Sequence, residues 1–358
     1  MDAMTDAISK EIELAAGFLE GSPVNTIYLG GGTPSLLPDE GLEHLLRKLK
    51  AYHPVGADAE ITLEANPDDI NAGRLETWKQ AGINRLSIGV QSFRDEDLRW
   101  MNRTHNAAQA SEVIRMARHA GFGHDSIDLI YGMPGLSDEA LRRNVATVIA
   151  LGCPHVSCYA LTVEPKTALA LDVQKGKMPP TDPDQQARQF LLVSDLLIAA
   201  GYEHYEISNF ALPGHRSRHN SSYWQGVSYL GLGPSAHSFN GRVRRWNVAG
   251  NTRYIQSLEA GVLPFEEEVL TPTQQLNEYV MTALRTMEGL DLQRVARLWG
   301  DAQRARLIKE SAKFREKGWM DWQRAGNGDS AEVLVLTREG RLFADGIASD
   351  LFDAATGY

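Results

Sequence analysis

Two spacings of apolar residues alternate along most of the chain. Short runs rich in β-branched and other apolar residues, each ending near glycine, proline or a polar turn, predict β-strands. These runs cover residues 25–30, 60–65, 85–90, 126–131 and 155–161. Between them, apolar residues recur every three or four positions, which predicts helices. The helical segments cover residues 39–52, 71–81, 107–120, 138–151 and 183–200. Repeated strand–helix units favour parallel strands in a curved, barrel-like sheet.

The beginning of the chain departs from this pattern. Residues 2–19 have helical spacing, although a βα barrel would place its first strand there. We therefore predict a partial barrel that lacks its first strand.

The character of the sequence changes again near Pro264. Residues 271–287 have helical spacing, further helices follow to residue 317, and residues 319–343 resemble a hairpin around Gly326-Asn327-Gly328. This order of helices followed by a hairpin is typical of a winged helix. We predict a first domain over residues 1–263 and a smaller α+β domain over residues 264–358.

Composition narrows the possible partners. The chain of 358 residues carries a formal net charge of -10, so its surface as a whole would repel nucleic acid. From Glu266 onward, 12 basic and 16 acidic residues argue against DNA binding by the winged-helix-like domain. The sequence has no apolar run long enough for a membrane span and no secretory leader. We expect a cytoplasmic protein, and leave open a peripheral place at the inner membrane.

Cysteine is scarce. Only Cys153 and Cys158 are present, too few for a disulfide framework, and we expect both to be buried strand residues. Alternation along a strand would point them to opposite faces, so a metal site built from both is not expected.

One window of the chain has an unusual charge distribution. No Asp or Glu lies between Glu206 and Glu259, although an even spread would put about seven there. The window holds six arginines and several aromatic residues, a mixture that suits a flat aromatic ligand bearing acid groups. The alternative is an ordinary folded stretch whose charges fell unevenly. The run His-Asn-Ser-Ser-Tyr-Trp from His219 to Trp224 favours the ligand.

Polar residues near the predicted strand ends suggest a second site. The glycine-rich turn 30–34 follows the first predicted strand, and its spacing fits neither a dinucleotide loop nor a P-loop. Glu64, Gln91 and Asp128 lie at or close to the ends of later strands, and Arg103 follows soon after Gln91. In a parallel sheet these side chains can converge on one small ligand. The acids could then bind an amine or ribose hydroxyls of that ligand, and the arginine could bind a carboxylate. The alternative is that they only tie loops together.

Seven motifs, in this order, carry a resemblance to a known family. They are Gly-Gly-Gly-Thr-Pro-Ser, Glu-Ala-Asn-Pro, Ser-Ile-Gly-Val-Gln-Ser-Phe, Met-Asn-Arg-x-His, Ile-Asp-Leu-Ile-Tyr-Gly-Met-Pro-Gly, Glu-Ile-Ser-Asn-Phe-Ala and His-Asn-x-x-Tyr-Trp. The set resembles the HemW family of heme chaperones. That family belongs to the radical S-adenosylmethionine (SAM) group, which includes oxygen-independent coproporphyrinogen III dehydrogenase. The match runs from about Asp2 into the C-terminal domain.

The resemblance implies a partial (β/α)6 barrel that binds SAM. The residues implied around SAM are Gly30, Gly31, Gly32, Thr33, Glu64, Gln91, Arg103, Asp128, Ile130 and Ala160. It also implies heme binding within residues 204–254, with His219 as the iron ligand and with Tyr223 and Trp224 packed beside it. His215 and His237 are alternative ligands, and His219 could instead simply cap a loop.

The sequence departs from the family at one point. Radical SAM proteins hold a [4Fe-4S] cluster through three cysteines of a Cys-x3-Cys-x2-Cys loop after the first strand. This chain has no such loop, and neither Cys153 nor Cys158 can replace it. We interpret the missing loop and strand as a single N-terminal deletion, and expect a cluster only in a longer form.

Three functions follow as hypotheses. The first is a heme chaperone that carries heme to respiratory-chain proteins, with a homodimer left open. The second is a coproporphyrinogen III dehydrogenase, which the run from His219 to Trp224 disfavours. The third is an RNA-binding surface in the arginine-rich window, which the net charge disfavours.

Overall fold

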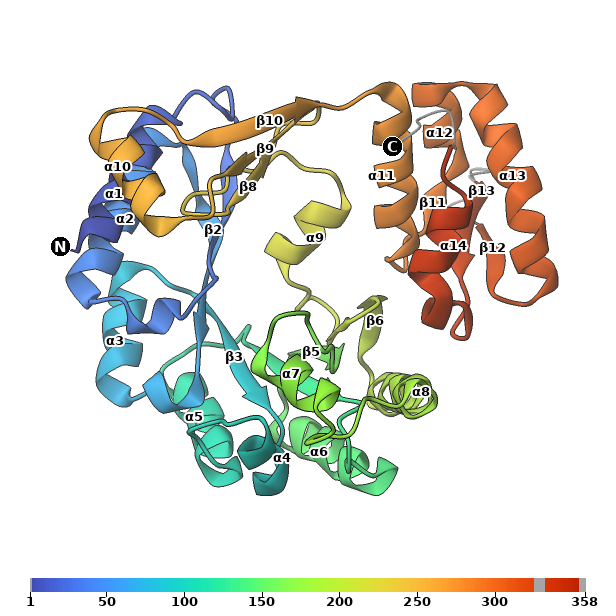
Figure 1. Cartoon of the computed structure of the whole chain (residues 1–358), viewed down its shortest axis with the longest axis horizontal. Coiled ribbons are helices and arrows are strands. Elements are labelled where there is room, and N and C mark those ends of the chain that lie inside the picture. Colours follow the sequence, from blue (N-terminus) through green and yellow to red (C-terminus); the bar gives the residue numbers. More distant parts are fainter. Residues whose placement is uncertain (1, 325–331, 354–358) are drawn as a thin grey trace.

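A curved seven-stranded sheet forms the larger part of the protein. The computed structural model describes residues 2–324 and 332–353. The strand order is β1-β2-β3-β4-β5-β7-β6, and Figure 1 shows the sheet bent into a half-barrel. Neighbouring strands from β1 to β5 pair in parallel. These strands are β1 (Val24–Leu29), β2 (Val55–Ala65), β3 (Arg85–Gln91), β4 (Ser126–Tyr131) and β5 (His155–Ala160). The predicted parallel, partial barrel is confirmed.

Beyond β5 the sheet continues with an antiparallel hairpin and not with another parallel strand. After β5 the chain adds a hairpin of β6 (Glu203–Glu206) and β7 (Asn209–Ala211), and β7 pairs antiparallel with β5. The sequence pattern did not predict this pair, because strands of three and four residues are too short to show alternation.

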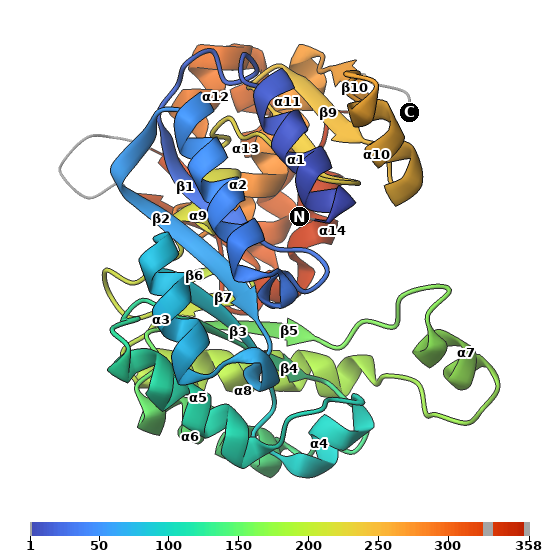
Figure 2. The ribbon, with the colours of Figure 1, turned by 90° about the vertical axis from the view of Figure 1, so that its left-hand side faces the viewer.

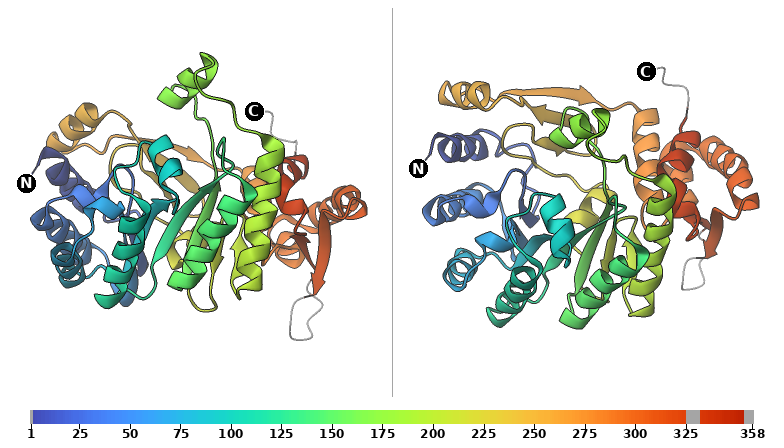
Figure 3. Two further views of the ribbon diagram at one scale, coloured as in Figure 1. Left: turned by 90° about the horizontal axis from the view of Figure 1, so that it is seen from below. Right: turned by 60° about the horizontal axis from the view of Figure 1, so that its bottom comes forward.

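Amphipathic helices cover the outer, convex face of the sheet (Figure 3). They are α2 (Asp39–Tyr52), α3 (Ala72–Ala81), α5 (Ala107–His119), α6 (Asp138–Leu151) and α8 (Pro183–Ala199). Polar side chains begin several of them, such as Asn106, which forms a capping box with Gln109. Two shorter helices, α4 (Asp95–Trp100) and α7 (Ala168–Gln174), lie in loops, and α7 stands away from the body (Figure 2).

The N-terminal helix is shorter than predicted. α1 (Ala3–Leu14) ends within the predicted segment 2–19, and residues 15–21 form turns that include Gly17 and Gly21. Glycine favours such turns because it loses more conformational freedom in a helix than other residues.

A buried carboxylate ties α1 to the later part of the chain. Glu11 accepts hydrogen bonds from the Gly233 amide at 2.8 Å and from Asn247 Nδ2 at 2.5 Å. It also accepts one from the hydroxyl of Tyr254. Burial raises the pKa of Glu11. Tyr254 belongs to α10 (Asn251–Glu259), which packs against α1.

A small antiparallel sheet extends the half-barrel. Its strands are β8 (His237–Phe239), β9 (Val243–Asn247) and β10 (Phe265–Val269), in the order β10-β9-β8. Strand β10 lies beyond the predicted domain boundary at residue 263 but pairs with β9. The limits of the two domains therefore stay a prediction.

The C-terminal elements have the winged-helix order that the sequence predicts. They are α11 (Pro272–Leu284), β11 (Leu290–Asp291), α12 (Leu292–Trp299), α13 (Asp301–Glu316), β12 (Met320–Arg324), β13 (Glu332–Leu336) and α14 (Ala344–Asp350). Their strands form an antiparallel sheet in the order β11-β13-β12. The turn Gly326-Asn327-Gly328 lies outside the described residues. A separate apolar cluster, with Val280, Leu307 and Leu334 fully buried, holds this part together.

Within the described ranges, no helix combines the length and the apolar character that crossing a membrane requires.

Candidate functional site

Side chains alternate across the sheet and give its two faces opposite character. On the convex face, Leu63, Ile88 and Val156 are fully buried in the main apolar core. The intervening residues are mostly polar. The polar residues that occupy these alternate positions, and that pair across neighbouring strands in the same register, are Thr26, Tyr28, Glu60, Thr62, Glu64, Arg85, Ser87, Ser126, Asp128, His155, Ser157 and Tyr159. Because side chains in a strand point to opposite faces in turn, these residues line the concave face.

Glu64 connects the end of β2 to the glycine-rich turn after β1. Its Oε1 accepts a hydrogen bond from the Tyr28 hydroxyl at 2.8 Å, and its Oε2 accepts one from the Gly31 amide at 3.1 Å. A Cβ on Gly30 would lie 2.5 Å from Tyr28 Cε1 and 2.8 Å from Glu64 Oε1, so only glycine permits this contact. Burial, followed by the charge of Glu64, raises the pKa of the Tyr28 hydroxyl.

The turn is open on its other side. Gly31 and Gly32 have positive φ angles, and a Cβ on either would meet no atom within 4 Å. Backbone with this freedom lets a ligand approach closely. Thr33 follows directly and begins a short 3-10 turn.

Asp128 and Arg103 add opposite charges near Glu64. Burial, together with the charge of Glu64, raises the pKa of Asp128 to about 7, while the charge of Arg103 opposes the shift. Arg103 Nη1 donates to Asn66 Oδ1 at 3.3 Å. A half-buried acid and an arginine in one place suit a ligand that carries both an amine and a carboxylate.

Gln91 is held in an unusual conformation at the end of β3. Its φ angle is +66°, a region that residues other than glycine rarely adopt, and its side chain is buried. A non-glycine residue in this region stores strain, which is typical of functional sites. Ile130 and Ala160 lie at the same ends of β4 and β5, where Ile130 pairs with Tyr159 and Ala160 pairs with Tyr131.

The run from His219 to Trp224 forms a short helix, α9 (Arg218–Trp224), that lies between the sheet and α11 (Figure 1). The His219 ring stacks on the Tyr28 ring, with centroids 4.7 Å apart and planes 18° from parallel. Tyr28 therefore touches both His219 and Glu64. The structure brings the two sequence-predicted sites into contact through a residue that neither prediction included.

Both nitrogens of His219 have hydrogen-bond partners. Nδ1 lies 2.9 Å from Thr26 Oγ1, and Nε2 lies 3.1 Å from the Tyr223 hydroxyl. Burial lowers the pKa of the His219 imidazole to about 4, so the ring is neutral near pH 7. A neutral imidazole whose second nitrogen is oriented by a hydrogen bond is the form that ligates metals in proteins.

The neighbours of His219 are aromatic on one side. The Tyr223 ring meets His219 edge-on at 5.0 Å and meets Tyr229 edge-on at 4.7 Å. Tyr223 is 37% exposed, so part of an aromatic ring is accessible beside the histidine. Trp224 turns toward the C-terminal part, where the Arg285 guanidinium lies 5.2 Å from its ring. Its indole nitrogen is buried and has no partner among the described residues.

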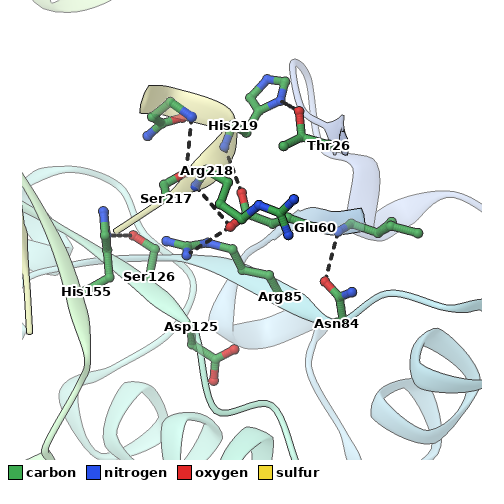
Figure 4. Close-up of polar contacts among 12 residues, drawn as sticks. Thr26, Glu60, Asn84, Arg85, Asp125, Ser126, His155, Ser217, Arg218 and His219 are labelled. Atoms are coloured by element: carbon green, nitrogen blue, oxygen red, sulfur yellow. Dashed lines mark hydrogen bonds and ion pairs between the residues drawn. The ribbon is translucent and has the colours of Figure 1, made fainter. Parts of the chain in front are cut away.

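A buried ion pair anchors the first turn of α9 (Figure 4). Glu60 Oε1 accepts from the His219 amide at 2.9 Å, and Glu60 Oε2 accepts from the Arg218 amide at 3.1 Å. Arg85 Nη1 lies 3.5 Å from Glu60 Oε2. Ser217 Oγ accepts from the Asn220 amide at 3.2 Å and completes the cap.

Most arginines of the acid-free window find carboxylates elsewhere in the chain. Arg216 pairs with Glu203 and Glu288, Arg218 with Asp58, Arg244 with Glu268 and Glu278, and Arg245 with Glu267. Within residues 2–324 and 332–353, Arg242 and Arg253 have no carboxylate within ion-pair distance. The sequence predicted an anionic ligand for the whole window, but the protein itself supplies much of the negative charge.

The other two candidate histidines lie in different surroundings. The His215 ring is 4.7 Å from the His124 ring, and burial together with the charge of His124 lowers the pKa of His215. The His237 ring is 6.4 Å from Trp246. Neither takes part in the hydrogen bonds that connect His219 to the sheet.

The two cysteines do not fit an iron–sulfur cluster. Cys158 lies on the helix-covered face of β5, and Cys153 is buried just before that strand rather than within it. Burial raises the pKa of Cys153 to about 12 and also raises that of Cys158, whereas a cluster needs thiolates. Across the described parts of the chain, no group of three or more His, Cys, Asp or Glu side chains is arranged to hold a metal ion.

Sequence reasoning missed Thr26, Tyr28, Glu60 and Arg85. A signal for Glu60 and Arg85 was present, because polar residues occupy every second position from Glu60 to Glu64 and from Arg85 to Ser87, in strands that are otherwise apolar. Alternation of this kind in a helix-covered sheet indicates a concave, functional face.

Known proteins are similar to this chain over most of its length. A model of the radical SAM superfamily matches residues 5–147. The heme chaperone HemW of Mycobacterium tuberculosis is 39% identical over 346 residues, which cover 96% of this chain and 85% of that protein. HemW of Bacillus subtilis is 34% identical over 340 residues, which cover 94% of this chain and 87% of that protein.

A solved structure is also similar over nearly the whole chain. Coproporphyrinogen III oxidase (HemN) of Escherichia coli, a radical SAM enzyme, superposes with a TM-score of 0.81 at 26% identity. The match covers 98% of this chain and 82% of that protein. With its radical SAM fold and its identity to the curated chaperones, this chain belongs to the HemW family.

Proposed function

We propose that this protein binds heme through His219 and carries it to heme-accepting respiratory proteins, as a heme chaperone. The observation that carries the proposal is the arrangement of the His219 ring. Thr26 accepts a hydrogen bond from Nδ1 when that nitrogen carries the proton, which leaves the lone pair of Nε2 as an acceptor for the Tyr223 hydroxyl. Nε2 lies on the side of the partly exposed Tyr223, where iron could replace the tyrosine hydroxyl.

The surroundings of Nε2 suit a porphyrin. Tyr223 and Tyr229, whose rings meet edge-on, offer aromatic surface to a flat ring. Burial raises the pKa of the Tyr229 hydroxyl, and the charge of the nearby Arg244 opposes this rise. The Arg244 guanidinium forms ion pairs with the half-buried Glu278 and Glu268. A propionate could take the place of one of these carboxylates, because bidentate pairing with arginine is strong.

The second part of the proposal is that SAM binds beside the glycine-rich turn. Glu64 and Asp128 would hold the amine or the ribose, Arg103 the carboxylate, and Gly30 to Thr33 the methionyl end. Gln91, Ile130 and Ala160 complete the surroundings. A bound cluster would supply electrons for SAM cleavage, but the cysteines of this chain do not fit one, so we propose binding without cleavage.

An enzymatic function is the second candidate, and the likeness to HemN favours it. That enzyme is described as a coproporphyrinogen III oxidase, and its fold covers nearly the whole of this chain. The chaperone is preferred because the curated relatives over most of the chain bear that name. The misfit of Cys153 and Cys158 to a cluster also disfavours radical chemistry in this chain.

The first prediction concerns the iron ligand. His219→Ala should weaken heme binding by about tenfold or more, a loss of roughly 1.4 kcal/mol, and shift the Soret band, because an axial ligand is lost. Heme titration followed by absorbance measures both. His215→Ala and His237→Ala serve as matched controls and should bind like the unmodified chain. Unchanged binding by His219→Ala would move the ligand elsewhere.

The second prediction concerns Tyr223, whose hydroxyl occupies the nitrogen proposed for iron. Tyr223→Phe keeps the ring but removes that hydrogen bond, so heme affinity should rise by about twofold to tenfold, the worth of one such bond. Tyr229→Phe, a neighbouring ring without this contact, is the control. Weaker binding by Tyr223→Phe would mean that the hydroxyl contributes to the bound state.

The third prediction is a pH dependence. Free histidine has a pKa of about 6.5, whereas burial lowers that of His219 to about 4. The neutral form that can bind iron therefore persists as pH falls through 6.5 and is lost only as pH approaches 4. The His219-dependent part of the Soret signal should survive at pH 5.5, with circular dichroism confirming that the protein is folded. Loss centred near 6.5 would contradict the burial of the ring.

The fourth prediction concerns iron and sulfide. After anaerobic reconstitution, this chain should show no stable iron–sulfur absorbance, because Cys153 and Cys158 are buried and have raised pKa values. The same preparation should still titrate with heme. A stable four-iron cluster held by this chain would overturn our reading of the two cysteines.

A further inference from the structure

We propose that Glu60 is the positioning residue that fixes His219 for iron, and that Arg85 provides the positive charge that this buried carboxylate needs. The inference rests on the proposed heme function of His219. Glu60 touches no proposed ligand and acts only through the helix that carries the histidine.

The first step of the argument is the isolation of α9. This helix has seven residues, and helices of that length are not stable by themselves in water. Its first amides therefore need partners from outside. Glu60 accepts from the amides of Arg218 and His219, and Ser217 accepts from the third, that of Asn220. Without Glu60, two amides of the first turn would lose their acceptors.

The second step is the register of β1 and β2. Thr26 and Glu60 are direct partners across these two strands. Thr26 binds the Nδ1 end of the His219 ring, and Glu60 binds the backbone amide of the same residue. Two neighbouring positions of a rigid sheet therefore hold one histidine by its side chain and by its main chain. Such an arrangement fixes the direction in which Nε2 points.

The third step is the environment of the carboxylate. Glu60 is 9% exposed and Arg85 is 2% exposed, so this ion pair is buried, unlike the pair between Arg218 and the exposed Asp58. Charges are costly to bury, and a buried pair gives weak evidence for stability but can specify one arrangement. Here the arrangement specified is the position of α9.

The experiment is a heme titration of Glu60→Gln with Soret spectra, beside hydrogen exchange of the Arg218 and His219 amides without heme. The carboxylate presents one oxygen to each amide, whereas the carboxamide keeps only one oxygen, so at least one of the two amides should exchange faster. Affinity should fall by about tenfold, roughly 1.4 kcal/mol, and the Soret band should move toward that of His219→Ala. Asp58→Asn is the matched control, because it removes only an exposed contact to the same helix. It should leave heme affinity, the Soret band and the exchange of both amides unchanged.

A second variant guards against misfolding. Glu60→Gln alone leaves the buried Arg85 without its negatively charged partner, which can unfold a protein, whereas Glu60→Gln with Arg85→Met removes both charges together. The double variant should be folded and should still show the loss of affinity. If His219→Ala weakens binding but both Glu60 variants bind like the unmodified chain, the inference fails alone. If His219→Ala binds normally, the proposed function fails, and the inference with it.

Discussion

Every second side chain of the parallel strands faces the interior of the half-barrel, and the rest of the structure depends on this constraint. The convex face is apolar and covered by helices, so it stabilises the sheet. The concave face is free to be polar, at the cost that each buried polar group needs a partner. The partners are provided by neighbouring strands and by segments that follow β5. Ser126 and His155, for example, are 2.7 Å apart, and His155 reaches the Tyr205 hydroxyl at the same distance.

Strand β2 carries two carboxylates that serve different neighbours. Glu64, at its end, binds the glycine-rich turn and Tyr28. Glu60, four positions earlier on the same concave face, binds the amides of α9. Since both lie on one rigid strand, the two candidate sites have a fixed spacing. Tyr28 connects them directly, with its hydroxyl on Glu64 and its ring on His219. A change at one site therefore has a short physical route to the other.

The acid-free window shows how charge patterns along a sequence can mislead. Its arginines lie close in sequence, but the strands and helices around them bring in acids from Asp58 to Glu288. Charge balance in a folded protein is local in space and not in sequence. The window therefore offers less free positive charge than its composition suggests, and this weakens the case for an RNA-binding surface.

The sequence by itself determined the parallel strands, their covering helices, the winged-helix order and the residues at the strand ends. These features depend on the spacing of apolar residues and on local motifs, both of which can be read along the chain. It also singled out His219 from its motif. Only the tertiary structure decided that Thr26 and Glu60 hold this histidine from two ends, because they are 193 and 159 positions away. No local pattern encodes contacts of that range, and the short strands β6 and β7 are likewise fixed by the sheet they join.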